Sequence, residues 1–197
     1  VISTTSENNN ISNGNITTHG ITGHGIYFTT TGSTNNSFSR MNIKTNGTNA
    51  YAIFIADTNH NFTIMDSILN SSRTNITNIT NTVRGGTWNF TNVTINGNGN
   101  GTRINWGTGG NGTLNVLWYL DVNVSNSVGS ALQNANVTAY NRTSGYQFSN
   151  LTGGNGMIST RILQEYKQIN KTILTYYSNY TINTTLTGYN NDTQSIN

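Results

Sequence analysis

The sequence predicts an all-β protein, and three observations support this fold class. A block of residues recurs along the N-terminal half at steps of 27, 26 and 26 residues, and a fixed period in this range indicates stacked structural units. The apolar residues of each block are β-branched or aromatic and stand in short groups between Asn, Gly, Ser and Thr, as in short strands. None of the blocks has the apolar spacing of three and four residues that a helical repeat needs.

Aligning the blocks gives three columns of residues that we expect to point inward and to stack from coil to coil. The columns are Ile11, Phe38, Ile64 and Phe90; Gly14, Met41, Ser67 and Val93; and Ile16, Ile43, Leu69 and Ile95. A second repeated stretch, Gly25–Phe28, is followed 27 residues later by Ala52–Ile55. Because one coil alone buries little apolar surface, we expect the stability to come from contacts between neighbouring coils.

A polar position separates the first column from the second in every block. It is occupied by Asn13, Arg40, Asp66 and Asn92. A polar residue inside an otherwise apolar strand predicts a bend, at which the side chain points to solvent.

The repeated pattern consists of a Gly-Ile-Tyr motif at Gly25, a turn rich in Ser and Asn, and an Asn-x-(Ile/Val/Phe)-x-Asn-x-x-Ile stretch. It resembles the right-handed parallel β-helix repeat of microbial, archaeal-type surface proteins, over about residues 9–97. The resemblance implies a short right-handed parallel β-helix of about four coils of 26–27 residues, at about 9–34, 35–60, 61–86 and 87–106. It implies little about function, because this fold hosts lyases, hydrolases, adhesins and scaffolds.

Three segments are predicted along the chain. Residues 1–8 form an extended, β-prone N-terminal segment, and residues 9–113 form the β-helix with a linker rich in Gly and Asn at its end. Residues 114–197 form a β-sandwich of the immunoglobulin or transthyretin type, because short predicted strands alternate there with Gly-containing turns. The expected strands are 116–124, 132–140, 146–148, 157–163 and 180–189.

The C-terminal segment resembles the carboxypeptidase-regulatory-like, transthyretin-like module, which is not catalytic. The residues that carry the resemblance are Leu120, Val122, Val124, Gly129, Ala135, Val137, Thr152, Gly153, Gly156, Leu163, Glu165, Tyr166, Gly188 and Tyr189. Leu132 departs from the pattern, since it stands near a position where that family commonly has Pro. Such modules often follow β-helices in surface proteins.

Composition and charge exclude several classes of function. The chain has 33% hydrophobic and only 8% charged residues, yet the ten Tyr, the columns and the low net charge of +3 indicate a folded chain. Lys and Arg form no cluster, which excludes a nucleic-acid surface. The absence of Cys excludes disulfides and thiolate metal sites, and no apolar run is long enough to span a bilayer.

The triplet Asn-x-Ser/Thr, the acceptor of N-linked glycans, occurs 20 times. Composition alone predicts roughly ten, and the excess continues beyond the repeats. An A/T-rich genome would also raise Lys, but the chain has only three Lys. We therefore predict a heavily glycosylated extracellular protein. The predicted acceptors are Asn10, Asn15, Asn35, Asn46, Asn61, Asn70, Asn75, Asn78, Asn89, Asn92, Asn100, Asn111, Asn123, Asn136, Asn141, Asn150, Asn170, Asn179, Asn183 and Asn191.

The sequence contains no set of residues typical of catalysis or of a bound metal or cofactor. β-Helix lyases and hydrolases need clustered acids, but the chain has only six. Asp57, His60 and Asp66 are the one local group, and we interpret them as turn residues. His19 and His24, five residues apart on a loop, fill repeat positions and form a poor metal pair.

The sequence thus predicts an extracellular, glycosylated structural protein, not an enzyme, that self-assembles into a filament or surface layer. Its partners would be further copies of the same chain, joined head to tail, and covalent N-linked glycans, with no nucleic acid and no membrane span. Residues 1–8 would pair with the sandwich of the next copy, whose last strand at 193–197 is short. The alternative that residues 1–8 begin a longer β-helix stays open.

A competing class is a carbohydrate-binding adhesin or a catalytically inactive relative of the β-helix polysaccharide lyases. Trp88, Trp106 and Trp118 could stack on sugars, although Trp118 lies in an apolar stretch that favours core packing. The sequence shows neither a cluster of acids nor exposed aromatic residues on one face, which this class would require.

Overall fold

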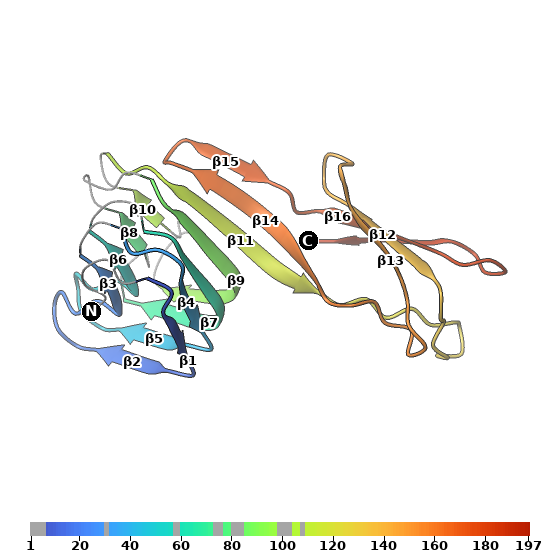
Figure 1. Cartoon of the computed structure of the whole chain (residues 1–197), viewed down its shortest axis with the longest axis horizontal. Coiled ribbons are helices and arrows are strands. Elements are labelled where there is room, and N and C mark those ends of the chain that lie inside the picture. Colours follow the sequence, from blue (N-terminus) through green and yellow to red (C-terminus); the bar gives the residue numbers. More distant parts are fainter. Residues whose placement is uncertain are drawn as a thin grey trace. The chain divides into compact units, whose positions relative to one another are not determined.

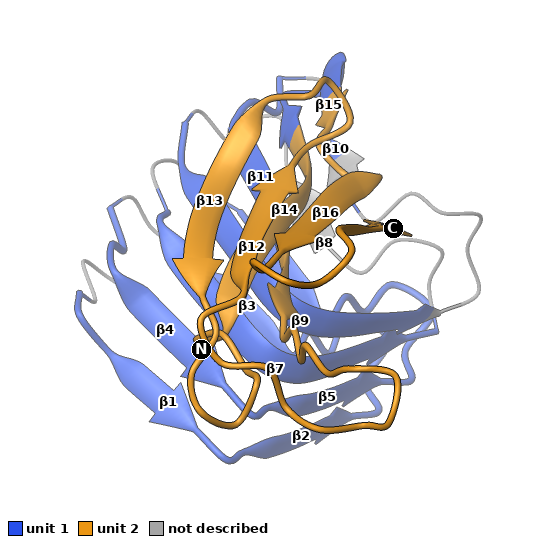
Figure 2. Ribbon diagram, turned by 90° about the vertical axis from the view of Figure 1, so that its right-hand side faces the viewer, with its two compact units in different colours: residues 1–116, 168–174 blue, residues 117–167, 175–197 orange. Residues whose placement is uncertain are grey.

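The computed structural model describes residues 7–29, 32–56, 60–72, 77–79, 85–97, 104–106 and 109–197. Within these ranges all regular secondary structure is β, as predicted (Figure 1). The chain divides into two compact units: unit 1 contains residues 1–116 and 168–174, and unit 2 contains residues 117–167 and 175–197 (Figure 2). The fold consists of a parallel β-solenoid of about three turns, residues 10–117, and a C-terminal antiparallel sheet.

The solenoid is built from two parallel sheets. The first contains β1 (Asn10–Ser12), β2 (Asn15–Thr18), β4 (Asn36–Ser39), β5 (Asn42–Thr45), β7 (Phe62–Ser71) and β9 (Thr87–Gly97). After β9, the hydrogen-bonded strand order continues with β11 (Thr113–Leu120), β14 (Arg161–Ile169) and β15 (Ile173–Tyr176), of which β14 and β15 lie outside the solenoid range. The second contains β3 (Ile26–Phe28), β6 (Ile53–Ile55), β8 (Thr77–Ile79) and β10 (Ile104–Trp106). Of the predicted fourth coil, residues 87–97 and 104–106 are described.

The parallel register confirms the predicted columns. Phe38 pairs with Ile64, and Ile64 pairs with Phe90. In the third column Ile43 pairs with Leu69. Phe38, Ile64 and Phe90 are only 2%, 0% and 1% exposed, because each lies between two neighbouring strands of the stack.

The first block behaves differently at its edge. Ile11 pairs with Phe38, but it is 39% exposed, since β1 is the end strand of the first sheet. In the second column, a Cβ atom on Gly14 would lie 2.6 Å from Met41 Cε. The Met41 side chain therefore occupies the space that a larger residue at position 14 would need.

The predicted bend is present in every block. Asn13, Arg40, Asp66 and Asn92 are exposed and have left-handed backbone φ angles of 57°, 52°, 49° and 52°. Asn and Asp enter this region more readily than most residues. The bend separates β4 from β5 and lies within the longer strands β7 and β9.

The repeat continues further than the sequence analysis predicted. Leu114 and Val116, at the start of β11, are buried like Trp88 and Phe90, which precede them by one 26-residue period. Asn115 Nδ2 donates a 2.8 Å hydrogen bond to the side chain of Asn89, which also lies 26 residues earlier in the sequence. The strand expected at 116–124 therefore begins at Thr113 as part of the solenoid sheet and ends at Leu120.

Unit 2 contains an antiparallel sheet with the strand order β13-β12-β16-β17. These strands are β12 (Asn136–Tyr140), β13 (Tyr146–Leu151), β16 (Tyr180–Thr185) and β17 (Asp192–Ile196). One face of the sheet packs on a core formed by Val137, Ala139, Phe148, Ile158, Leu163, Tyr180 and Ile182. Leu120, Val122, Val124, Tyr177 and Ile196 pack against this core but stay partly exposed. The core is thus open on the side of residues 120–124 and β17.

Candidate functional site

None of the predicted glycan acceptors whose side chains the structure describes is buried. Among the described side chains, Asn10, Asn15, Asn35, Asn46, Asn92, Asn111, Asn123, Asn179 and Asn191 are exposed, and Asn61, Asn70, Asn89, Asn136, Asn141, Asn150, Asn170 and Asn183 are half-buried. Asn75, Asn100 and the side chain of Asn78 lie outside the described part of the chain. Asn36, which is not followed by the acceptor triplet, is 1% exposed.

Several acceptors also stabilise the backbone through the side-chain oxygen. Oδ1 of Asn61 accepts a hydrogen bond from the Thr87 N–H (2.7 Å), and Oδ1 of Asn170 accepts one from the Gly112 N–H (2.9 Å). Asn92 uses Nδ2, which donates to Asp66 Oδ1 at 2.8 Å. An N-linked glycan attaches to Nδ2, leaves Oδ1 unchanged and keeps one N–H. These structural hydrogen bonds are therefore compatible with glycosylation.

The acids and histidines singled out in the sequence do not come together in the described residues. His60 is buried, Asp66 is exposed at its bend, and Asp57 lies outside the described residues. His19 contacts the Asn46 side chain at 3.3 Å. Across the described ranges, no group of three or more His, Cys, Asp or Glu side chains could hold a metal ion.

No helix in the described part of the chain is suited to crossing a membrane.

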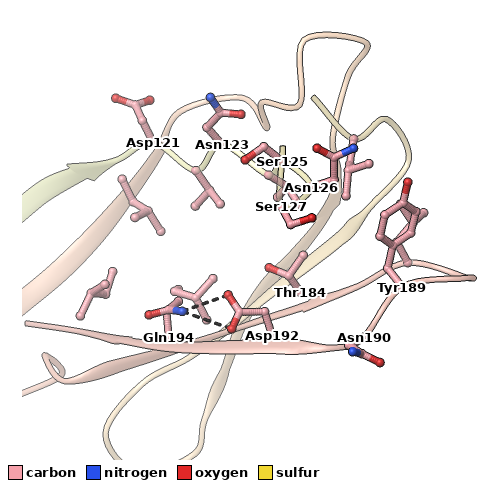
Figure 3. Close-up of a pocket in the computed structure, with 17 residues that line it drawn as sticks. Asp121, Asn123, Ser125, Asn126, Ser127, Thr184, Tyr189, Asn190, Asp192 and Gln194 are labelled. Carbon is pink, nitrogen blue, oxygen red and sulfur yellow. Dashed lines mark hydrogen bonds between the residues drawn. The ribbon is translucent and has the colours of Figure 1, made fainter. Parts of the chain in front are cut away.

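Unit 2 contains a groove of about 680 Å³ (Figure 3). Residues 120–127 and Leu132 form one wall, and residues of β16, β17 and the turn between them form the other. Val122, Val124, Ile182 and Ile196 line the groove, and all four belong to or pack against the open core of unit 2.

Polar side chains on both walls surround these apolar groups. Asp121, Asn123 and Ser125 lie on one wall in Figure 3, and Asp192 and Gln194 lie on the other. Gln194 Nε2 donates to both carboxylate oxygens of Asp192, at 3.2 and 3.0 Å. The groove therefore offers an apolar floor with hydrogen-bonding groups at its margins.

Residues 121–126 form an extended segment with one paired and one open edge. Val122 O accepts from the Ile158 N–H (3.3 Å), and Val124 N–H donates to Gly156 O (2.8 Å). On the same edge, Val124 O accepts from the Leu132 N–H at 2.9 Å. Isolated bridges accordingly join Asn123 to Met157 and Ser125 to Ala131.

The other edge of this segment belongs to Asn123 and Ser125. In an extended chain, the N–H and C=O groups of alternate residues point to opposite sides. Since Val122 bonds to Ile158, and Val124 bonds to Gly156 and Leu132, the backbone groups of Asn123 and Ser125 face the other way. No other described residue forms a hydrogen bond with them.

A second candidate site is a cluster of half-buried rings on the solenoid. Tyr27 of β3 and Phe54 of β6 are in register, and their ring centroids are 5.1 Å apart. The His24 ring stacks on the Phe54 ring, with a distance of 4.3 Å between centroids. The Tyr51 N–H donates to His24 Nδ1 at 3.1 Å, so a neutral His24 carries its proton on Nε2. Burial lowers the pKa of His24 below its ordinary value of 6.5, which favours this neutral form.

A shallow hollow of about 340 Å³ adjoins this cluster, lined by Thr22, His24, Gly25 and Tyr27. None of these residues is charged at neutral pH when His24 is neutral. The hollow therefore suits an uncharged ligand that offers both a ring face and hydroxyl groups.

The tryptophans are less suited to this role. Trp88 and Trp106 are buried and pack against each other at 5.7 Å. Trp118 is half-buried, and its Nε1–H donates to Glu165 Oε2 at 2.6 Å. Their position in the core excludes Trp88 and Trp106 as sugar-stacking residues.

Comparison with known proteins gives no relative: no protein family, no curated protein and no solved structure matches this chain. The two candidate sites therefore depend on the geometry described above. The sequence predicted an acceptor for residues 1–8 in the C-terminal segment, but neither the groove at residues 120–127 nor the ring cluster. The 27-residue spacing of Tyr27 and Phe54, and of His24 and Tyr51, was the available signal for the ring cluster.

Proposed function

We propose that this protein is an extracellular, N-glycosylated structural protein that self-assembles into a filament or surface layer. The proposal keeps the finer fold that the sequence resemblance implies, with right-handed coils and a transthyretin-like C-terminal unit. The surface position of the described acceptor asparagines supports the glycosylated state. The chemistry of the sheet edges supports self-assembly, and it is the observation that carries the proposal.

Among the described residues, seven strands lie at the edges of the three sheets: β1, β2, β15, β3, β10, β13 and β17. Six of them contain no Asp, Glu, Lys or Arg, and β17 contains only Asp192. Tyr146 and Leu151 of β13 are 62% and 61% exposed, and Ile173 of β15 is 51% exposed. Monomeric proteins commonly protect sheet edges with charges, because an open edge can pair with another chain. These edges lack that protection and favour association.

Imaging of native material by negative stain, together with sedimentation of the purified protein, tests the proposal. We expect filaments or sheets. Leu151→Lys and Ile173→Lys place a charge on an edge strand and should reduce assembly. Val128→Lys is the matched control, since Val128 is 82% exposed but lies in a turn. Native material that is monomeric at all concentrations would contradict self-assembly.

Intact mass spectrometry of the same native material tests glycosylation separately. We expect a mass well above the 21.4 kDa of the bare chain. A native mass equal to that of the bare chain would contradict the glycosylated state, whatever the images show.

Carbohydrate binding by an adhesin is the second candidate function, and the ring cluster at His24, Tyr27 and Phe54 favours it. Aromatic faces next to polar groups suit sugar rings, which present C–H faces and hydroxyls. We expect Tyr27→Ala to abolish saturation-transfer signals from bound oligosaccharides, and Tyr146→Ala, an exposed tyrosine on unit 2, to leave them unchanged. Equal signals from both variants would contradict a sugar site at the cluster.

A further inference from the structure

We propose that the groove of unit 2 accepts an extended segment from a second copy of this chain, namely residues 1–6, as an additional β-strand. This inference rests on the proposed self-assembly and names one contact that would contribute to it, in addition to the sheet edges. Three properties of the groove and of the segment support it: an open backbone edge, an apolar floor and a matching donor.

The open backbone edge supplies the hydrogen bonds. Asn123 and Ser125 are two residues apart and present their N–H and C=O groups on the same side, as a strand does toward its neighbour. A strand placed alongside them would satisfy four backbone groups. Peptides that add a strand to a sheet gain affinity from such main-chain bonds, and gain specificity from pockets for alternate side chains.

The apolar floor supplies the burial. Val122, Val124 and Ile196 are only partly buried, although they pack against the core of unit 2. Alternate side chains of an inserted strand would point toward these three residues and cover them. A six-residue strand spans about 20 Å, and the groove volume of about 680 Å³ lies within the range that small binding sites occupy.

The donor matches the groove in chemistry. Residues 1–6 lie outside the described part of the chain and read Val-Ile-Ser-Thr-Thr-Ser, which is rich in β-branched residues. The segment has no charged side chain until Glu7, so its side chains do not repel Asp121 or Asp192 at the groove.

The contact is heterologous, because the donor precedes β1 of the solenoid whereas the acceptor lies in unit 2. Each copy would offer one donor and one groove, and such contacts produce open fibres when they do not close into a ring. This agrees with the head-to-tail order that the sequence analysis predicted.

Disulfide trapping tests the inference, and the absence of native cysteine makes it clean. One preparation of purified protein carries Ser3→Cys or Thr4→Cys, and a second preparation carries Ser125→Cys in the groove. The preparations are mixed, oxidised and run on non-reducing gels. A disulfide requires Cα atoms within about 7 Å, so a linked pair reports close contact between two copies.

Ser195→Cys is the matched control. Ser195 is exposed on β17 between Gln194 and Ile196, which line the groove, but it does not line the groove itself. We expect Ser125→Cys to link with one of the two donor cysteines and not the other, because Ser3 and Thr4 face opposite sides of an extended strand. Links to Ser195→Cys should stay at background.

A synthetic peptide of residues 1–6 provides a second measurement, and it should compete for the groove and reduce the link. The proposal is overturned if neither donor cysteine links to Ser125→Cys, if Ser195→Cys links equally well, or if Ser125→Cys links only to itself. Filaments that form without the predicted link would leave the proposed function standing and remove only this contact. Native material without any assembly would contradict the proposed function itself.

Discussion

Replacing Ile64 with Ala tests whether the stacked columns stabilise the solenoid. Ile64 is fully buried in β7 and pairs with Phe38 on one side and Phe90 on the other. The change removes three carbon atoms, and their transfer from water contributes about 2.4 kcal/mol at roughly 0.8 kcal/mol each. The cavity left between two aromatic neighbours adds to this, so we expect a loss of about 2–5 kcal/mol in the free energy of unfolding.

Ile68→Ala is the matched control, because it makes the same change in the same strand. Ile68 is 44% exposed, and we expect its replacement to cost at most about 0.5 kcal/mol. At about 4 °C per kcal/mol for a unit of this size, Ile64→Ala should lower the melting temperature by about 8–20 °C. Circular dichroism and tryptophan fluorescence, with Trp88 and Trp106 as probes within unit 1, would follow the transition.

Equal destabilisation by Ile64→Ala and Ile68→Ala would refute the inward column. A melting curve of Ile64→Ala identical to that of the unsubstituted protein would refute the stacking argument as well. Ile64→Asp buries a carboxylate at the same place and should prevent folding of the solenoid.

Three further predictions concern the backbone, the histidines and the glycans. Arg40 has a left-handed φ angle of 52°, which Gly adopts without a steric cost, so Arg40→Gly should stabilise the protein by about 0.5–1 kcal/mol. Asp66 has a φ angle of 49°, which a β-branched residue adopts poorly, so Asp66→Val should destabilise the protein by at least about 1–2 kcal/mol. Denaturant titrations would measure both changes. Because burial lowers the pKa of His24 from 6.5, neutral His24 contributes stability above pH 6.5 that is lost as the pH falls below that value. His24→Asn keeps an acceptor for the Tyr51 N–H and should remove this part of the pH dependence of melting, whereas His19→Asn, at an exposed position, should not. Glycopeptide mapping of native material should find sugars at exposed acceptors such as Asn46 and Asn179 and none at Asn36; a sugar on Asn36 would contradict the buried position of that side chain.

The solenoid was predictable because parallel stacking repeats the same environment at the same sequence interval. Phe38 and Ile64 occupy one column since strands in register share a face, and the period of 26–27 residues records this directly. The bend at Arg40 and Asp66 was predictable for the same reason. The start of β11 was missed because the Gly- and Asn-rich stretch before it resembles a linker, although the period continues from Phe90 to Val116.

The groove could not be predicted in the same way. It depends on which backbone groups remain unpaired, and these follow from hydrogen bonds between residues distant in sequence, such as Val122 with Ile158. The pattern of residues 120–124 predicted a strand, but an apolar strand reads the same whether one or both of its edges are paired. The ring cluster shows a similar limit, because the spacing of Tyr27 and Phe54 marks a repeat position without showing that both rings remain partly exposed.

The same composition explains both the solenoid and its proposed surface. With 8% charged residues, the outward positions are filled largely by Asn and Thr, and asparagine side chains such as Asn89 and Asn115 bridge one coil to the next. A surface of this kind has little charge repulsion to oppose unspecific contact between copies. N-linked glycans at the exposed asparagines would cover much of it, and sheet edges and a groove that stay uncovered would then direct association. Enzymatic removal of the glycans should therefore turn ordered assembly into irregular aggregation, and assemblies of unchanged order after deglycosylation would contradict this division of roles.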